Sequence, residues 1–294
     1  MLGSSAGGGF PQWNCSCPGC RAVRDQSRRT CRRTQSSLAI RGDDGPWYLV
    51  NASPDVTTQL EALPANPAGG PRATPFAGIL LTDAELDHTL GLFTLREASQ
   101  PLSLFGASLV RQALSSGLPV LPLLERWCGV RWTDLVPGAR IQLEGGLAVE
   151  PWVAGGGPPR YLTEPGAGPA VLGLTFTASG AALTYAPGLG ALDEGTVARL
   201  RASDCALVDG TCWHDDDLAR AGVGNRRARE MGHVPLAGPG GSLDVLAALD
   251  ATRVVLVHVN NTNPVLLEDS PERRELEARG LEVAEDGLTI RLPA

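Results

Sequence analysis

The sequence is poor in aromatic side chains and has no apolar segment long enough to cross a bilayer. Phe, Trp and Tyr together make up 5% of the 294 residues, so the core must be mostly aliphatic. A membrane-spanning helix needs about 20 consecutive apolar residues. The first residues, MLGSSAGGGFPQW, lack the charged start and long apolar segment of a signal peptide. These absences predict a soluble, cytoplasmic protein without a membrane partner.

Basic residues are too few and too dispersed for a nucleic-acid-binding surface, and no internal repeat divides the chain. The formal net charge is -7 and the pI is about 5.2, whereas binding to nucleic acid needs clustered basic surface. The arginine run between Arg21 and Arg41 is the one local exception. With 43% hydrophobic residues the chain can bury an ordinary globular core. We expect one domain over residues 1–294 and no nucleic-acid partner.

The cysteines are seven in number, and three of them, Cys15, Cys17 and Cys20, lie together as CSCPGC. This spacing favours metal binding in a reducing compartment over a disulfide framework. Structural zinc is favoured over free thiols, because an exposed thiol cluster would oxidise without a metal. Three thiolates leave a tetrahedral zinc one ligand short, and Cys31 is the nearest candidate, although an Asp, a His or a second chain in a homodimer could supply the ligand instead. We therefore expect a zinc-binding, Cys-rich insertion at about 10–33, with a basic loop after the third cysteine.

A cluster of charged side chains directly follows an apolar run in the stretch ILLTDAELDHTLGL, residues 79–92. Its carboxylate and imidazole side chains are Asp83, Glu85, Asp87 and His88. Charged groups are costly away from water unless they are paired or bind a cation, so acids at the end of a buried strand indicate a metal site or a catalytic pocket. A solvated acidic turn before a capped helix is the alternative, but His88 and the helical pattern from Thr89 to Leu95 favour the pocket.

Two further apolar strands end in candidate ligands: Cys205 to Val208 precedes Asp209, and Val254 to Val257 precedes His258. The strands come in meanders and not in regular alternation with helices, which disfavours a doubly wound parallel sheet. We predict an α+β fold in which two mixed sheets pack face to face with helices outside and loops at one sheet edge assemble a metal site. This arrangement resembles the metallo-beta-lactamase fold, an αββα sandwich.

The patterns of other segments predict strands, turns and loops. Strands at 34–40 and 47–51 flank a turn and predict a hairpin, and a second strand pair is expected from 282–284 with 288–292. A loop rich in Pro and Gly covers 64–75. The glycines at 7–9 let the backbone approach a neighbour closely, and the strand expected in front of them suggests that the chain could begin further upstream.

The first ligand motif of the metallo-beta-lactamase fold usually reads HxHxDH, and the aligned residues here are Asp83-x-Glu85-x-Asp87-His88. Acids replace the two histidines that belong to one metal position. The resemblance implies that the second position is kept and that the site holds a single metal. Its ligands would be Asp87, His88, Asp209 and His258. Two imidazoles with one or two carboxylates suit non-haem Fe(II), and zinc or manganese would also fit.

A narrower resemblance rests on long motifs spread over nearly the whole chain: LGSSAGGGFPQWNCSCPGC, LTDAELDHTLGLFTLRE, MGHVPLAGPGG and HVNNTNPVL. In these motifs the sequence resembles the pyrroloquinoline quinone (PQQ) biosynthesis protein B family. The resemblance implies an iron-dependent hydroxylase of the tyrosine ring in the crosslinked Glu-Tyr precursor of PQQ. The alternative that it implies is a carrier of PQQ or its precursor towards the periplasm. Its partners would be that small molecule and other PQQ biosynthesis proteins.

The residues agree with oxygen chemistry better than with hydrolysis. Hydroxylating a phenol ring with oxygen needs a redox metal with free coordination positions, which a facial set of two histidines and a carboxylate leaves. His88, His258 and either Asp87 or Asp209 could supply such a set. A hydrolase of the ordinary metallo-beta-lactamase kind is disfavoured, because two-metal activation of water loses its first set of ligands in this sequence.

Two spare histidines could also act in the pocket. His233 could shuttle a proton or contact the substrate and is a catalytic candidate; an ordinary loop histidine is an equal alternative for His233 and the favoured one for His214. The implied substrate carries several carboxylates, so an arginine is expected nearby, with Arg96 and Arg160 as candidates. Three amide side chains follow the last strand and could orient a carboxylated substrate or hold a loop: Asn260, Asn261 and Asn263.

Overall fold

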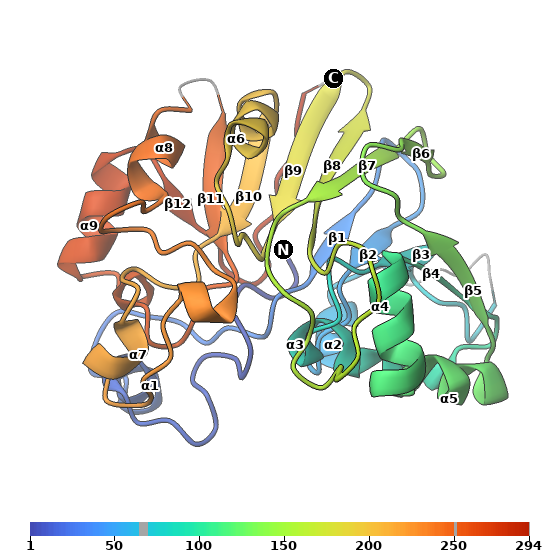
Figure 1. Cartoon of the computed structure of the whole chain (residues 1–294), viewed down its shortest axis with the longest axis horizontal. Helices are drawn as coiled ribbons and strands as arrows, with labels where there is room; N and C mark the ends of the chain where they lie inside the picture. The colour runs from blue at the N-terminus through green and yellow to red at the C-terminus, as the bar shows by residue number, and fades with distance from the viewer. Residues whose placement is uncertain (65–69, 250–251, 294) are drawn as a thin grey trace.

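Two mixed β-sheets pack face to face and share one buried cluster of mostly aliphatic side chains (Figure 1). Leu80 of the first sheet and Leu174 of the second both belong to this cluster, and both are fully buried. The computed structural model describes residues 1–64, 70–249 and 252–293, so residues 65–69 of the expected Pro/Gly loop lie outside it.

The first sheet has five strands in the order β1-β2-β3-β4-β5. β1 and β2 are antiparallel, with Leu38 opposite Val50, which confirms the predicted hairpin in a shorter form. The other neighbouring strands are parallel. The strands are β1 (Leu38–Ile40), β2 (Tyr48–Val50), β3 (Gly78–Leu80), β4 (Leu102–Gly106) and β5 (Val130–Asp134).

The second sheet has seven strands in the order β12-β11-β10-β9-β8-β7-β6. The four strands from β9 to β12 run parallel, and the remaining neighbours are antiparallel. The strands are β6 (Ile141–Gln142), β7 (Ala148–Val153), β8 (Leu172–Ala178), β9 (Ala181–Ala186), β10 (Cys205–Asp209), β11 (Arg253–Val257) and β12 (Glu282–Val283).

Helices flank both sheets on the outside, which confirms the predicted αββα arrangement. Figure 1 shows α8 and α9 beside the second sheet, and α4 and α5 beside the first. Side-chain caps begin α6, where Asp193 accepts from the backbone of Thr196, and α9, where Ser270 accepts from that of Arg273. The helices are α1 (Pro18–Asp25), α2 (Val56–Leu60), α3 (Leu86–Thr89), η2 (Leu90–Glu97), α4 (Ser108–Gln112), η3 (Ala113–Gly117), α5 (Val120–Trp127), α6 (Glu194–Arg201), α7 (Asp217–Arg220), η4 (Arg229–Met231), α8 (Leu243–Ala247), η5 (Pro264–Leu266) and α9 (Pro271–Ala278).

Two further local predictions are wrong, and a third is confirmed with a different helix type. The basic stretch after Cys20 is not a loop at its start, because α1 begins with a proline at its first turn and buries Cys20 and Val23 on one face. The helix predicted from Thr89 to Leu95 is confirmed, and most of it is the 3-10 helix η2. The expected partner strand at 288–292 is absent from the described residues, because β12 pairs in parallel with β11 instead.

None of the helices in the described part of the chain has both the length and the apolar character needed to span a bilayer.

A buried carboxylate after β10 predicts a pH-dependent change in stability. Asp217 is 3% exposed and accepts a hydrogen bond from the backbone of Trp213 at 2.6 Å, while burial raises its pKa to about 6 from 3.8. The folded protein therefore binds more protons than the unfolded chain between pH 4 and 6, so the contribution of Asp217 to stability falls as pH rises through this window. Asp217→Asn keeps the acceptor oxygen and should exceed the wild type in free energy of unfolding by roughly 1–3 kcal/mol above pH 6.

Urea unfolding of the wild type and Asp217→Asn across this pH range measures the difference. The two proteins should converge below pH 3.8, where the carboxyl group becomes protonated in both the folded and the unfolded wild type. A difference that stays constant with pH would assign the effect to packing and not to the buried charge.

Candidate metal centre

The candidate ligands follow three strands whose carboxyl ends meet at one edge of the sandwich. β3 of the first sheet leads into α3, which carries Asp87 and His88. β10 ends at Asp209, and its parallel neighbour β11 is followed directly by His258. The imidazole rings of His88 and His258, which come from different sheets, have centroids 5.1 Å apart. The fold therefore brings together the two halves of the site that the sequence separates by 170 positions.

A first group of ligand atoms converges between the two sheets. Asp87, His88 and His258 can each offer an atom so that all three atoms lie within 4.8 Å of one another. The Oδ2 atom of Asp87 is 3.1 Å from Nε2 of His258 and 3.9 Å from Nε2 of His88. Within the described part of the chain, Nε2 of His88 is buried and has no hydrogen-bond partner. A buried polar atom without a partner is costly, so this arrangement fits a metal ion bound by the three side chains.

His88 is oriented by an acid on its other ring nitrogen. Both carboxylate oxygens of Asp83 lie 2.8 Å from Nδ1 of His88. Burial alone would lower the pKa of His88, but the carboxylates of Asp83 and Asp87 outweigh burial and raise this pKa to about 9. A proton on Nδ1 shared with Asp83 leaves the Nε2 lone pair for a metal. Asp83 therefore supports a ligand and does not take the place of the missing histidine of the family motif.

The loop between β2 and α2 supports this acid in turn. The side chain of Asn51 accepts a hydrogen bond from the backbone of Thr82 at 3.0 Å, and the hydroxyl of Thr82 donates to Asp83 at 2.7 Å. Asn51 itself has a positive φ of 62°. Strained backbone of this kind persists where the surrounding contacts hold it in place, so the support of Asp83 extends across two parallel strands.

His258 is held by Thr211, a residue that the sequence patterns did not single out. The Thr211 hydroxyl donates to Asp209 at 2.6 Å and lies 2.9 Å from Nδ1 of His258. Because the hydroxyl has one proton to give, it accepts from the Nδ1–H of His258, which assigns the lone pair to Nε2. The Nε2 lone pair then faces Oδ2 of Asp87 at 3.1 Å. Because both atoms are hydrogen-bond acceptors, a proton or a cation is needed between them. His258 also has a φ of 55°, a left-handed backbone that directs the ring into the site.

A second group shares His258 with the first. Asp209, His233 and His258 can also offer three atoms within 4.8 Å of one another. Oδ2 of Asp209 is 2.5 Å from Nδ1 of His233, and the backbone of Leu189 donates to the same oxygen at 2.9 Å. The rings of His233 and His258 stack at 5.2 Å. The four residues predicted as one set thus fall in two groups that share His258, with Asp87 and His88 in the first group and Asp209 in the second.

The remaining candidates lie at different distances from the centre. Arg160 and Glu85 line a cavity of about 600 Å3 that also reaches Asp87. Arg96 does not line this cavity, because its guanidinium stacks over the ring of Trp127 at 5.4 Å. His214 belongs to neither group of candidate ligands among the described residues.

The glycine loop near the start of the chain packs against the first group. A Cβ atom on Gly7 would come within 3.2 Å of Oδ2 of Asp87, so a side chain here would press on the carboxylate. The backbone of Ala6 donates to the carbonyl of Val259, next to His258, at 3.0 Å. The loop therefore closes one side of the centre, and a residue larger than glycine at position 7 would displace the carboxylate of Asp87 by a few tenths of an ångström.

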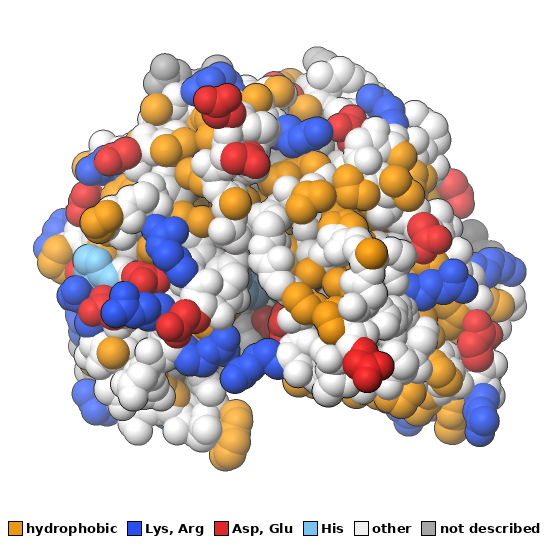
Figure 2. All heavy atoms as spheres, viewed as in Figure 1, with side chains coloured by type: hydrophobic (Ala, Val, Ile, Leu, Met, Phe, Trp, Pro, Cys, Tyr) orange, Lys and Arg blue, Asp and Glu red, His pale blue; other side chains and the backbone are white. Residues whose placement is uncertain are grey.

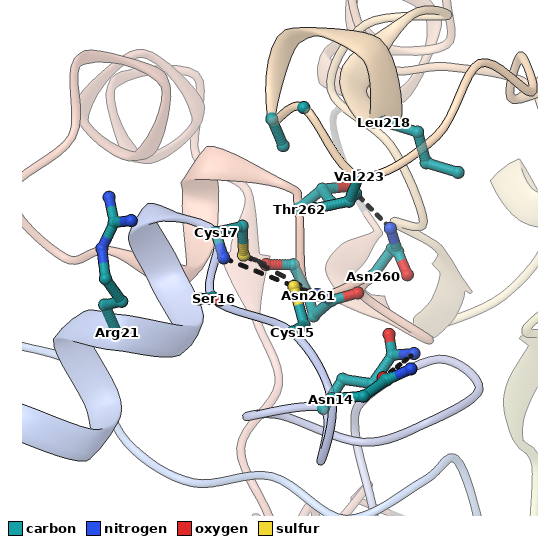
Figure 3. Close-up of a pocket in the computed structure, with 13 residues that line it drawn as sticks. Asn14, Cys15, Ser16, Cys17, Arg21, Leu218, Val223, Asn260, Asn261 and Thr262 are labelled. Atoms are coloured by element: carbon teal, nitrogen blue, oxygen red, sulfur yellow. Dashed lines mark hydrogen bonds between the residues drawn. The ribbon is translucent and has the colours of Figure 1, made fainter.

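The three cysteines predicted as a metal cluster do lie together. The sulfur atoms of Cys15, Cys17 and Cys20 are buried and lie within 4.8 Å of one another. Burial raises the pKa of Cys17 to about 12. Figure 3 shows Cys15 and Cys17 beside Asn261, whose amide nitrogen lies 3.1, 3.7 and 3.4 Å from the three sulfurs in chain order. The prediction of Cys31 as the nearest fourth ligand is wrong, because Cys31 lies outside this group and beside Glu285.

One short loop joins the two clusters. The loop of residues 258–263 carries a candidate ligand of the metal centre, His258. Three positions later it carries Asn261, whose side chain contacts the cysteines. The backbone of Asn260 donates to the carbonyl of Thr211 at 3.0 Å, and the side chain of Asn263 donates to that of Gly210 at 2.8 Å. These bonds tie the loop to the end of β10, and the side chain of Asn263 has the loop-holding role that was one of the two expected for these amides.

Replacing Asp83 with asparagine should weaken metal binding while preserving the shape of the site. Asparagine cannot hold the proton on Nδ1 of His88 with a negative charge, and loss of such a partner typically costs roughly 10–100-fold in metal affinity. Competition with a chelator, read by elemental analysis, measures this change. Glu85→Gln is the matched control, because Glu85 lines the cavity and, among the described residues, its side chain makes no hydrogen bond to His88; only its backbone carbonyl accepts from the backbone of His88. Equal metal affinity in Asp83→Asn and the wild type would contradict the supporting role of Asp83.

The chain is similar to known proteins over nearly its whole length. A family model described as a beta-lactamase superfamily domain matches residues 46–259. The chain is 46% identical over 301 residues to the coenzyme PQQ synthesis protein B of Azoarcus sp., with 99% of each chain covered. It is 44% identical over 299 residues to that of Methylococcus capsulatus, covering 99% of this chain and 98% of the relative.

The chain is also similar in fold to solved structures. A crystal structure of zinc-bound PqqB from Methylobacterium extorquens is similar with a TM-score of 0.91 and 39% identity, covering 99% of this chain and 98% of that one. A diphosphatase from the PhnP family has a TM-score of 0.68 at 18% identity, covers 99% of this chain and 96% of that one, and shares the fold alone.

Proposed function

Because the chain belongs to the coenzyme PQQ synthesis protein B family of the beta-lactamase superfamily, we propose that it is a metal-dependent oxygenase of PQQ biosynthesis. Its substrate is the crosslinked Glu-Tyr precursor, and the reaction hydroxylates the tyrosine ring. One oxygen atom of dioxygen enters the ring and the other leaves as water, with two electrons from an external reductant. A role in PQQ biosynthesis follows from the family, and the hydroxylation is the proposed step.

The observation that carries this proposal is the convergence of Nε2 of His88, Nε2 of His258 and a carboxylate oxygen of Asp87. Two imidazoles and one carboxylate would hold Fe(II) and leave coordination positions open, and zinc or manganese would also fit this donor set. Iron bound there would supply the redox chemistry with dioxygen that a phenol ring needs. The acids that replace the histidines of the first motif argue against a two-metal hydrolase, since Asp83 is engaged by His88.

The protein's own groups supply orientation and proton transfer. Asp83 holds the ring of His88, and Thr211 holds that of His258. His233 is the proposed proton acceptor for the phenol, because Asp209 binds its Nδ1 and leaves Nε2 to exchange a proton. Burial would lower the pKa of His233, but the charge of Asp209 outweighs it and raises this pKa. The chain thus provides a base next to the metal centre.

The cysteine cluster is proposed as a structural zinc site. Three thiolates need one further ligand for a tetrahedral ion, and the amide of Asn261 faces all three sulfurs. The oxygen and nitrogen of an amide are assigned by their hydrogen bonds, so a rotated Asn261 would offer its oxygen to the ion. This ligand comes from the same chain and requires no second subunit.

Oxygen uptake tests the proposed function. Protein loaded anaerobically with Fe(II) should consume oxygen with the tyrosine-containing precursor and a reductant such as ascorbate, and one oxygen atom from labelled dioxygen should appear in the product. Zinc-loaded protein is the control and should be inactive. Tight binding of PQQ or the precursor with no uptake at any metal loading would instead support the carrier role.

A further inference from the structure

The cavity beside the metal centre has a charged layout that the metal ligands do not explain. It measures about 600 Å3, which suits a small molecule. Its lining includes two carboxylates, those of Asp87 and Glu85, and two guanidinium groups, those of Arg160 and Arg226. Figure 2 shows a hollow at the centre of this face, with cationic side chains at its lower rim and an acidic group within it. Asp87 is half-buried whereas Arg160 is exposed, so a ligand that fills the cavity meets the carboxylate of Asp87 further from solvent than the guanidinium of Arg160.

The two arginines have no anionic partner of their own. Arg160 is exposed, and no carboxylate among the described residues lies within ion-pair distance of it or of Arg226. Arg226 donates to the backbone carbonyl of Glu230 at 3.0 Å, which leaves its positive charge uncompensated. By contrast, the next residue, Arg227, pairs with Asp215 at 3.6 Å. The charges of Arg160 and Arg226 are thus available to a ligand.

The arginines come from separate segments, one between β7 and β8 and the other between α7 and η4. The chain contains no lysine, so all of its side-chain cations other than histidine are planar guanidinium groups. A guanidinium binds a carboxylate through two parallel hydrogen bonds, which sets orientation as well as affinity. Two such groups from different segments would fix a ligand with carboxylates at one end and hold its other end toward Asp87.

We propose that Arg160 and Arg226 form a carboxylate-binding subsite that orients a small polycarboxylate in the cavity. The ligand class rests on the proposed function, because PQQ carries three carboxylates around an aromatic quinone. The anionic lining near Glu85 repels carboxylates, so the uncharged part of the ring system lies at the metal centre. The subsite thereby determines which end of the molecule is presented for reaction.

Binding of PQQ to zinc-loaded protein, read by quenching of tryptophan fluorescence, tests the subsite. Arg160→Gln and Arg226→Gln should each weaken PQQ binding roughly tenfold, and the double variant roughly 100-fold, because each loses a charge-assisted pair. The trimethyl ester of PQQ should bind the wild type and the variants equally. Arg111→Gln is the control, since Arg111 is exposed on α4 and does not line the cavity. Melting temperatures check that every variant is folded.

The outcomes separate the subsite from the proposed function. Unchanged PQQ binding in the double variant, no PQQ binding by the wild type, or equal competition by inorganic phosphate at matched concentration would overturn the subsite. If the wild type hydroxylates the precursor with the same KM as the double variant, the subsite fails and the function stands. If PQQ binding depends on both arginines but no oxygen is consumed, the function fails and the subsite stands.

Discussion

Replacing His258 with alanine is expected to remove the active-site metal and abolish turnover together. His258 supplies one of the three converging ligand atoms, and its ring also contacts both His88 and His233. Loss of a residue that only orients a ligand costs roughly 10–100-fold in metal affinity, so loss of the ligand itself should cost more. Oxygen uptake should fall to the background rate at micromolar iron. Elemental analysis should find the metal of the cysteine cluster still bound.

A second substitution separates metal binding from backbone strain. His258 has a φ of 55°, and alanine tolerates this left-handed backbone less well than asparagine does. His258→Asn should therefore lose the metal as fully as His258→Ala while retaining more of the wild-type stability. His214→Ala, which removes a histidine outside both groups, should keep metal and turnover. Normal turnover in His258→Ala would show that the metal is held elsewhere.

Replacing Cys17 with serine is expected to release one equivalent of zinc and to destabilise the whole chain. Structural zinc binds small domains with roughly 10–16 kcal/mol, and loss of one of three thiolates removes much of that stabilisation. We expect a melting temperature lower by roughly 5–10 °C. Because residues 258–263 join the clusters, affinity for the active-site metal should fall as well.

The matched control is Cys31→Ser, which changes a cysteine of the same region that lies outside the cluster. It should leave the zinc content and the melting temperature within experimental error of the wild type. Asn261→Ala should resemble Cys17→Ser in a milder form, because three thiolates remain. If Cys17→Ser kept its zinc while Cys31→Ser lost it, the ligand set would have to be reassigned.

The polar motif after β3 could be predicted from the sequence because its residues are close together in the chain. A buried strand followed by Asp83, Asp87 and His88 predicts a polar pocket from local pattern alone, and the same reasoning applies to CSCPGC. The role of Asp83 as a partner of His88 could not be predicted from the sequence. Its position in the motif indicates a replaced ligand, whereas the structure turns both of its oxygens to Nδ1 of His88.

Contacts between distant segments were the part that sequence could not predict. Asn261 was one of three amides with no distinguishing neighbour, yet it is the one that reaches the sulfurs. No sequence pattern indicates Arg226, and none separates Arg96 from Arg160, whereas in the structure the guanidinium of Arg96 stacks over the ring of Trp127. The pairing of Asp209 with His233 likewise joins the last residue of β10 to the segment after η4.

The sequence by itself determined the family, the two-sheet sandwich and the strand ends at which polar groups gather. Strand patterns and short motifs depend on residues that are neighbours in the chain, so the sequence shows them directly. Only the tertiary structure decided which of those groups share a point in space and which acid supports which imidazole. The physical reason is that side-chain direction and loop packing are set by contacts across the sandwich. Those contacts join residues far apart in the chain, and no local spacing encodes them.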